Sequence, residues 1–457
     1  MKDSSKNSSL LSLLLFIIIT TITYSFQNMI PPNNYVISDY FGFGKDISQL
    51  GFLTFSFMIV SGISMLLFGY LTDKLIRKWI VFFGILIYST FVSLVILVPP
   101  GTSGYFLFFI LMCMMGIGFG AIIPSIFSLI GDLVSQDNRS KGYSFFSIST
   151  LFGMLLGILL ATFASSLDWR FSFLIIGILG LVITVILLFF KEPTRIGKDH
   201  LDLIRKDDII YSYRIKKEDL KEIFKKKSNF WLILNFVDTI PTGIILFLLW
   251  AYMEDIHNVS REMAIFFLAF IFLSTLIGTI IFGIIGDNLF RKGYKKARVY
   301  LALMANVAPI PFVFFGLMVP FRAPDGVTIG SLFLIPGAVL MLILTCIGLF
   351  LNGATNGSWY ATVVDINLPE HRGTVLATAN FFDILGRALG PWIGAVVSDA
   401  LDPLAGINLS IVFWIFLPFF WIPVLKNVIP EMEDTEKIFR ERIEKLKKEE
   451  EEWVKNL

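Results

Sequence analysis

Cysteine, histidine and charged residues are scarce in this chain. Its 457 residues include two Cys and three His, and 16% of the residues are charged. Two thiols cannot make a disulfide framework, and Cys113 and Cys346 both fall inside apolar runs, where free cysteines act as small packing residues. The sequence contains no phosphate-binding loop, nucleophile elbow or metal-ligand spacing. We therefore expect no metal site and no cofactor, and enzymatic chemistry is disfavoured.

Apolar residues fill the chain instead. Hydrophobic residues make up 55% and aromatic residues 15%, and the mean hydropathy is +0.75, outside the range of soluble globular proteins. In lipid, an apolar run of about 20 residues satisfies its own backbone hydrogen bonds by forming a helix. The sequence predicts an all-α membrane protein with twelve transmembrane helices, at roughly 9–30, 48–70, 79–98, 105–131, 143–166, 171–190, 229–252, 263–285, 299–319, 330–362, 375–398 and 405–426.

A charged motif between these runs occurs twice. Residues 69–78 read GYLTDKLIRK and residues 283–292 read GIIGDNLFRK, so both have the form Gly-x-x-x-Asp-x-x-x-Arg-Lys. Further residues recur with matched spacings: Asp132 and Arg139 with Asp365 and Arg372, and Gly153 and Gly157 with Gly386 and Gly390. Internal repetition of this kind in a membrane protein indicates two pseudo-symmetric six-helix bundles around a central site.

Polar stretches divide the chain into four parts. Residues 1–190 and 229–428 each contain six predicted helices. The segment 191–228 joins them, and its mixed charges suit either a short amphipathic helix on the membrane surface or a plain linker. Residues 429–457 carry Glu and Lys at helical spacing, which predicts a charged helix or a solvated tail.

Lysine and arginine are unevenly distributed across the predicted membrane. All but five of the 38 lie in the termini or in the even-numbered loops, and the five are Lys45, Arg170, Arg261, Arg322 and Arg387. Since cytoplasmic loops carry the excess of basic residues, both termini are predicted to be cytoplasmic. We expect a monomeric multi-pass protein of the plasma membrane, surrounded by lipid. A solvated cytoplasmic face explains the basic loops, so no nucleic-acid partner is expected.

With these features the chain resembles the major facilitator superfamily, whose signature loop reads Gly-x-Leu-x-Asp-x-x-x-Arg-[Lys/Arg]. The resemblance implies that the loops are latches, which hold the cytoplasmic side closed while the cavity faces outward. An Asp at a helix end can accept charge-assisted hydrogen bonds from Arg, although basic residues could also merely anchor the loops. The latch residues are Gly69, Asp73, Arg77, Lys78, Gly283, Asp287, Arg291, Lys292, Asp132, Arg139, Asp365 and Arg372.

Three short segments are similar to spinster-type transporters of lysolipids and sphingolipids: residues 31–35, 191–195 and 386–391. Two positions depart from the pattern of related transporters. Met112 stands in helix four where an arginine is usual, and helix one has no acidic residue before Asn28. A coupling scheme that needs either group does not transfer to this chain.

Charged residues are costly inside the membrane and usually face a cavity or a partner. Asp238, Asp383 and Arg387 lie at depths of about 12–18 Å from the cytoplasmic helix starts, near the midplane. Asp383 and Arg387 share a helix face at i, i+4, and we expect Arg387 to pair with one or both aspartates. The group is either a structural ion pair or a coupling and substrate site. Polar residues that could line the same cavity are Asn235, Asn380, Gln27 and Asn28.

The sequence therefore predicts a secondary active transporter that works by alternating access and moves a small or amphipathic organic solute. Coupling to protons is a hypothesis at this point. The main alternative is a receptor or scaffold that uses the same fold without transporting, because fold does not imply function. An intramembrane enzyme would need a nucleophile, a metal set or an acid pair in the cavity.

Overall fold

The computed structural model describes residues 2–133, 139–163, 167–190, 192 and 219–455. Within these ranges the side chains at 2–11, 73–74, 131–133, 139–148, 219–220, 356, 369–370, 372–373, 377, 443 and 446–455 are not described. Every regular element in the described ranges is a helix. The predicted surface helix in 191–228 falls outside them, apart from Glu192 and residues 219–228.

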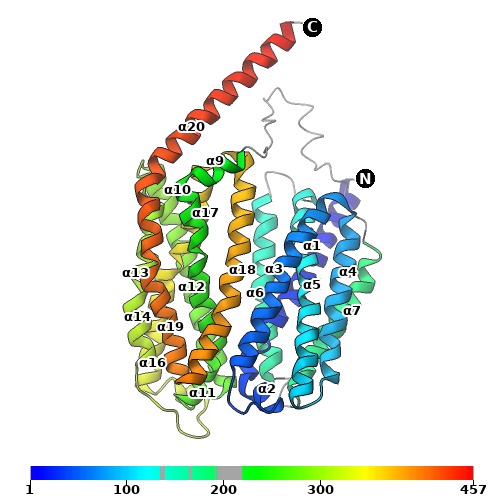
Figure 1. Ribbon diagram of the computed structural model, residues 1–457, viewed down its shortest axis with the longest axis vertical. Coiled ribbons are helices and arrows are strands. Elements are labelled where there is room, and N and C mark those ends of the chain that lie inside the picture. The colour runs from blue at the N-terminus through cyan, green and yellow to red at the C-terminus, as the bar shows by residue number, and fades with distance from the viewer. Residues whose placement is uncertain (1, 134–138, 164–166, 191, 193–218, 456–457) are drawn as a thin grey trace. The chain divides into compact units, whose positions relative to one another are not determined.

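The helices pack into two compact units, each drawn in Figure 1. Unit 1 contains the described residues of 1–206 together with 246–252 and 387–406, and unit 2 contains those of 207–245, 253–386 and 407–457. Two helices from the second half of the sequence are therefore divided between the units. Residues 246–252 of α11 (Thr239–Asp255) and residues 387–400 of α18 (Pro369–Ala400) belong to unit 1.

The helices of the first half begin with α1 and end with α7. Their bounds are α1 Lys2–Ser25, η1 Phe26–Asn28, η2 Pro31–Asn33, α2 Asn34–Tyr40, α3 Ser48–Lys74, α4 Arg77–Ser93, η3 Leu94–Leu97, α5 Thr102–Leu133, α6 Arg139–Phe163 and α7 Trp169–Leu187. The main packing partners are α3 with α5, α4 with α5 and α7, and α1 with α6.

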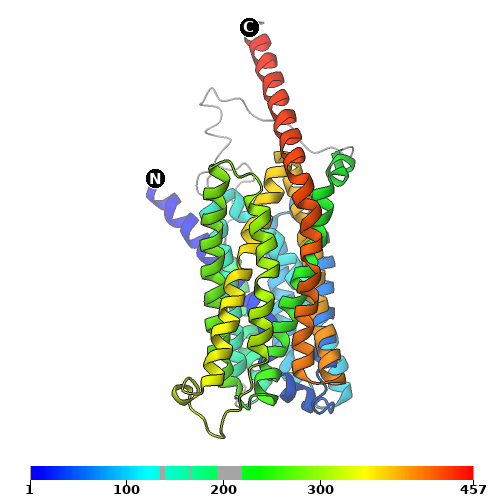
Figure 2. The same ribbon diagram turned by 90° about the vertical axis from the view of Figure 1, so that its left-hand side faces the viewer.

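The helices of the second half begin with α9 and end with the long α20, which continues past α10 and α17 in Figure 1. Their bounds are α9 Asp219–Lys225, α10 Lys227–Leu234, η6 Asn235–Asp238, α11 Thr239–Asp255, α12 Arg261–Arg291, α13 Ala297–Val307, α14 Pro309–Leu317, α15 Ile329–Leu332, α16 Pro336–Asn352, α17 Ala354–Ile366, α18 Pro369–Ala400, α19 Pro403–Phe416 and α20 Pro418–Lys455. Figure 2 shows the loop that carries α15 at the opposite end of unit 2 from α9.

Eleven helical segments among the described residues are long and apolar enough to cross a membrane. They match eleven of the twelve predicted runs. The remaining run, 143–166, falls on α6, where Ser149–Phe163 forms a shorter apolar helix. The prediction of an all-α membrane protein is confirmed.

Several predicted helices are interrupted rather than continuous. The run predicted at 229–252 is confirmed as the helical span Lys227–Asp255, within which the 3-10 helix η6 separates α10 from α11. The run 299–319 breaks before Pro309, which lacks a backbone N–H, and the run 330–362 breaks at Gly353. A Cβ at Gly353 would lie 2.6 Å from the Thr279 nitrogen, so the break lies where α12 approaches most closely.

The sequence repeat corresponds to a repeated helix contact. Gly153 on α6 packs against α1, where an added Cβ would meet the Thr21 carbonyl oxygen at 2.5 Å. In unit 2, Gly386 on α18 packs on Thr239, where an added Cβ would lie 2.2 Å from the hydroxyl. Small residues at such positions let helix backbones approach closely. A close contact between a glycine and a threonine thus joins α6 to α1 in the first half of the sequence and α18 to α11 in the second half.

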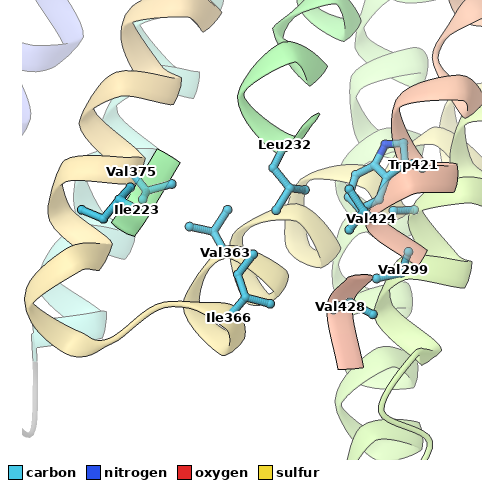
Figure 3. Close-up of a cluster of buried hydrophobic side chains, with 10 residues drawn as sticks. Ile223, Leu232, Val299, Val363, Ile366, Val375, Trp421, Val424 and Val428 are labelled. Atoms are coloured by element: carbon cyan, nitrogen blue, oxygen red, sulfur yellow. The ribbon is translucent and has the colours of Figure 1, made fainter. Parts of the chain in front are cut away.

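Ten buried apolar side chains form a cluster in unit 2 (Figure 3). Its members are Ile223, Leu232, Val299, Ala302, Val363, Ile366, Val375, Trp421, Val424 and Val428. The Lys226 ammonium donates to the Ile366 carbonyl and, at 2.7 Å, to the Thr435 hydroxyl. Burial lowers the pKa of Lys226, and nearby acidic residues of α20 oppose that shift. The start of α10 is therefore fixed to α20 and to the end of α17.

Candidate functional site

We call the end of each unit that carries its copy of the repeated motif the repeat end. In unit 1 this motif turns from α3 into α4, and in unit 2 it ends α12. A Cβ on Gly69 would meet its nearest atom, in Pro124, at 3.9 Å, and one on Gly283 would meet nothing within 4 Å. Close packing therefore explains neither motif glycine.

Arg77 is held at the repeat end of unit 1 by a carboxylate far away in the sequence. Its side chain is 3% exposed, and its Nε donates to Glu192 Oε1 at 3.0 Å. Its Nη1 donates to the Ser128 carbonyl and hydroxyl oxygens at 3.2 and 3.0 Å. The predicted latch arginine thus ties α4 to α5 and to the residues after α7.

Glu192 also caps α4. Its carboxylate accepts the backbone N–H groups of Arg77 and Lys78, at 3.2 and 3.0 Å, which a helix N-terminus would otherwise leave unpaired. Burial alone would raise the pKa of Glu192, but these hydrogen bonds outweigh it and hold the pKa below its ordinary value. The residue was noted in the sequence only as part of a family resemblance. Its role was missed because its partner lies 115 residues away.

The repeat end of unit 2 is organised by an arginine outside the predicted motif. Arg298, in the first turn of α13, donates from Nη2 to Asp287 Oδ1 at 2.7 Å and from Nη1 to Asp365 Oδ2. Its guanidinium carbon lies 4.2 Å from the centre of the Phe290 ring. Arg291, the expected partner, has an exposed side chain. Asp287 and Asp365 are thus brought together, but around Arg298.

Four predicted latch side chains lie outside the described part of the structure: Asp73, Asp132, Arg139 and Arg372. Lys78 is described, and its ammonium donates to the Leu188 carbonyl at 2.7 Å. Lys292 is the exposed C-cap residue that follows α12. The latch role of the whole set stays a prediction.

Two carboxyl groups of unit 2, those of Asp238 and Asp383, lie within electrostatic range of each other. Asp238 is the last residue of η6, and its neighbours include Asp383 on α18 and Trp414 on α19. The Thr239 hydroxyl donates to the Asp383 carbonyl oxygen at 3.0 Å, which fixes α18 against the break in helix seven. Asn235 is 7% exposed, and its Oδ1 lies without a hydrogen-bond partner among the described residues.

Arg387 lies one turn further along α18, in unit 1. Its side chain is exposed and lies within electrostatic range of the Tyr24 hydroxyl on α1. The Tyr24 ring packs edge-on against Phe119 at 5.3 Å, and Asn28 donates to the Tyr24 carbonyl oxygen at 3.3 Å. Asn380 is also exposed on α18. Tyr24 was not among the predicted site residues, because a tyrosine in an apolar run carries no distinguishing pattern.

Comparison with known proteins identifies relatives for most of the chain. Residues 13–391 match the Major Facilitator Superfamily. "Protein spinster" of Drosophila melanogaster is 32% identical over 160 residues, 34% of this chain and 25% of that protein. "Sphingosine-1-phosphate transporter SPNS2" of Danio rerio is 25% identical over 372 residues, 76% of this chain and 67% of that protein. The match to the fruit-fly protein therefore spans a quarter of its length.

Among solved structures, the fold is similar to a bacterial homolog of the human lysosomal transporter Spinster in an inward-facing, unoccupied conformation. The TM-score is 0.75, with 16% identity, over 93% of this chain and 98% of that one. The likeness establishes a shared fold.

The Arg298 cluster predicts a ranking of substitutions. Asp365 is 19% exposed and Asp287 is 51% exposed, so Asp365→Asn should lower the melting temperature of the purified protein more than Asp287→Asn does. Arg291→Gln is the matched control and should leave it nearly unchanged. Differential scanning fluorimetry in detergent measures all three. A larger loss for Arg291→Gln than for Asp365→Asn would show that the motif arginine, rather than Arg298, organises this end.

Proposed function

Because the chain belongs to the Major Facilitator Superfamily, whose members are secondary transporters that work by alternating access, we propose that it couples protons to the movement of an amphipathic organic anion. The observation that carries the proposal is the hydrogen bond from Thr239 to the Asp383 carbonyl oxygen, which brings α18 to the break after Asp238 and leaves the two carboxyl groups within electrostatic range. The superfamily is a class of transporters and not of enzymes.

The two carboxyl groups of unit 2 suit proton binding. Two carboxyl groups within electrostatic range of each other raise the free-energy cost of ionising both, and this favours binding of a proton. Asp238 lies at a break in helix seven, and Asp383 is tied to that break through Thr239. Protonation can therefore act directly on the contact between helices seven and eleven. This supports a coupling role in place of the carboxylate and arginine that are missing from helices one and four.

Arg387 supports an anionic solute. Its guanidinium is the charged group of α18 nearest to Asp383 along the helix, and it carries five N–H donors suited to carboxylate or phosphate oxygens. In unit 1 it lies near the Tyr24 hydroxyl, which can also donate. The name of the zebrafish relative refers to sphingosine 1-phosphate, an amphipath with an anionic phosphate head. A solute of that chemical class fits these groups.

The basic loops support an orientation in which both repeat ends and both termini face the cytoplasm of a plasma-membrane protein. In that orientation the Arg77 and Arg298 clusters lie at the cytoplasmic surface. There they can stabilise each unit while the cytoplasmic side opens and closes.

A receptor or scaffold built on the same fold is the remaining alternative. It would bind solute but would not move it across a sealed vesicle. Transport and binding therefore have to be measured separately.

The anion site predicts a selective loss of binding. In a thermal-shift panel of lysolipids, sugars, organic acids and cationic drugs, anionic amphipaths should raise the melting temperature of the wild-type protein most. Arg387→Gln should remove most of that shift, and Arg387→Lys should retain part of it because the charge remains. An undiminished shift in Arg387→Gln, or a stronger shift with cationic drugs, would contradict the anion site.

The proposed proton site predicts that one substitution abolishes uptake of solute driven by a pH gradient but preserves exchange of solute across the membrane. In proteoliposomes, Asp238→Asn should lose accumulation driven by a pH gradient, because the pair no longer binds and releases a proton. It should retain exchange of solute across the membrane. Glu254→Gln, on an exposed residue at the end of α11, is the control and should behave as the wild type does. Full gradient-driven accumulation by Asp238→Asn would exclude coupling through this residue.

A further inference from the structure

A second pair of aspartates lies at the end of unit 1 opposite its repeat end, where α18 meets the start of α3. Asp399, in the last turn of α18, accepts two backbone N–H groups. Ile47 donates to its Oδ1 at 3.0 Å, and Ser48 donates to its Oδ2 at 2.6 Å. These donors belong to the first turn of α3, where a helix leaves N–H groups unpaired and favours negative charge. The two halves of the sequence are joined at this point.

Asp46 completes the contact. Its Oδ1 accepts the Ser48 backbone N–H at 3.0 Å and the Ser48 hydroxyl at 2.6 Å. The Ser48 backbone N–H thus donates to both carboxyl groups, which places Asp46 and Asp399 next to each other. The contact with Asp399 and the hydrogen bonds from Ser48 hold the pKa of Asp46 below its ordinary value. Ionised carboxylates can only accept, so two carboxyl groups so placed can bond to each other only when they share one proton.

The contact is reinforced by close packing below it. A Cβ on Gly51 would lie 2.7 Å from the Pro391 carbonyl oxygen and 2.9 Å from Trp392 Cα, so α3 and α18 touch through their backbones. The Trp392 ring lies 5.7 Å from that of Phe52 and 5.1 Å from that of Phe55. Separating α18 from α3 would break this packing and the aspartate bonds together.

The titratable groups near the aspartate pair along the neighbouring elements include Lys45, Asp402 and Tyr105. The Lys45 ammonium lies 5.2 Å from the centre of the Tyr35 ring, and Asp402 accepts the Ala405 N–H at 2.6 Å. On α5, the Tyr105 hydroxyl donates to the Gln49 carbonyl oxygen at 3.2 Å. Asp46 and Asp399 are both exposed. The pair can therefore exchange its proton with the water on its own side of the membrane.

We propose that Asp46 and Asp399 form a proton-operated latch on the external side, which holds α18 on the start of α3 while they share one proton. When the proton leaves, two adjacent carboxylates repel each other and the contact weakens. Low external pH therefore favours the closed external side, and rising external pH favours its opening. The proposal rests on the proposed orientation and on alternating access, but it needs neither the identity of the solute nor the Asp238 site.

The test measures distance instead of transport, so it is independent of whether a solute is found. Exposed Val36 and Leu401, both in unit 1, are replaced by Cys in a full-length protein whose Cys113 and Cys346 are changed to Ser. Nitroxide labels on the two cysteines are measured by pulsed electron resonance in lipid nanodiscs, between about pH 5 and pH 8, the range over which a shared carboxyl proton is lost. The wild type should show a short distance in acid and gain a longer population as the pH rises.

Two variants identify the groups responsible. Asp399→Asn keeps acceptor oxygen for the α3 donors and removes the titrating charge, so the short distance should persist at every pH. Asp46→Asn leaves Asp399 without a like-charged neighbour and should also lose the pH response. Asp402→Asn, three residues beyond Asp399, is the control and should respond as the wild type does. A wild-type distance that does not change with pH, or a full response in both Asp46→Asn and Asp399→Asn, would overturn the proposal.

Discussion

The cost of placing a charge away from water is the constraint on which this structure depends. At the repeat ends, Arg77 is met by Glu192, and Arg298 is met by Asp287 and Asp365. The pairs with Glu192 and Asp365 join segments 115 and 67 residues apart in the sequence, so these charges also position helices. At the break between α10 and α11, Asp238 and Asp383 lie within electrostatic range of each other, and the cost of ionising both like-charged groups suits them to binding a proton.

The architecture of two repeated halves could be predicted because it leaves regular patterns. Apolar runs predict the helices. Equal spacing from the repeated Asp and Arg residues pairs Gly153 with Gly386, and in the structure each of these glycines packs against a threonine. The helix breaks were less accessible. Pro309 marks one. Pro241 lacks the N–H that would bond the Val237 carbonyl in η6, but η6 begins six residues before it, at Asn235, where the sequence carries no breaking residue.

The candidate site shows the same limit. Arg77 and Asp287 of the repeated motif both make ion pairs, but the motif does not predict their partners. Glu192 lies after the sixth helix, and Arg298 is one of several basic residues between 291 and 298. Nothing local distinguishes either residue. The two halves also use different solutions, since a carboxylate caps the helix in unit 1 and an arginine is shared by two carboxylates in unit 2. An internal repeat therefore predicts where charges gather, but not which of them pair.

The central claim is that solute movement and proton movement are one process. The most direct test imposes a solute gradient without a pH gradient on proteoliposomes that contain a trapped pH-sensitive dye. The solute should be the one that stabilises the protein most in the binding panel. The account predicts that the lumen pH changes as solute crosses, and that the change stops in Asp238→Asn while solute still equilibrates. Solute flux in the wild type with an unchanged lumen pH would contradict it.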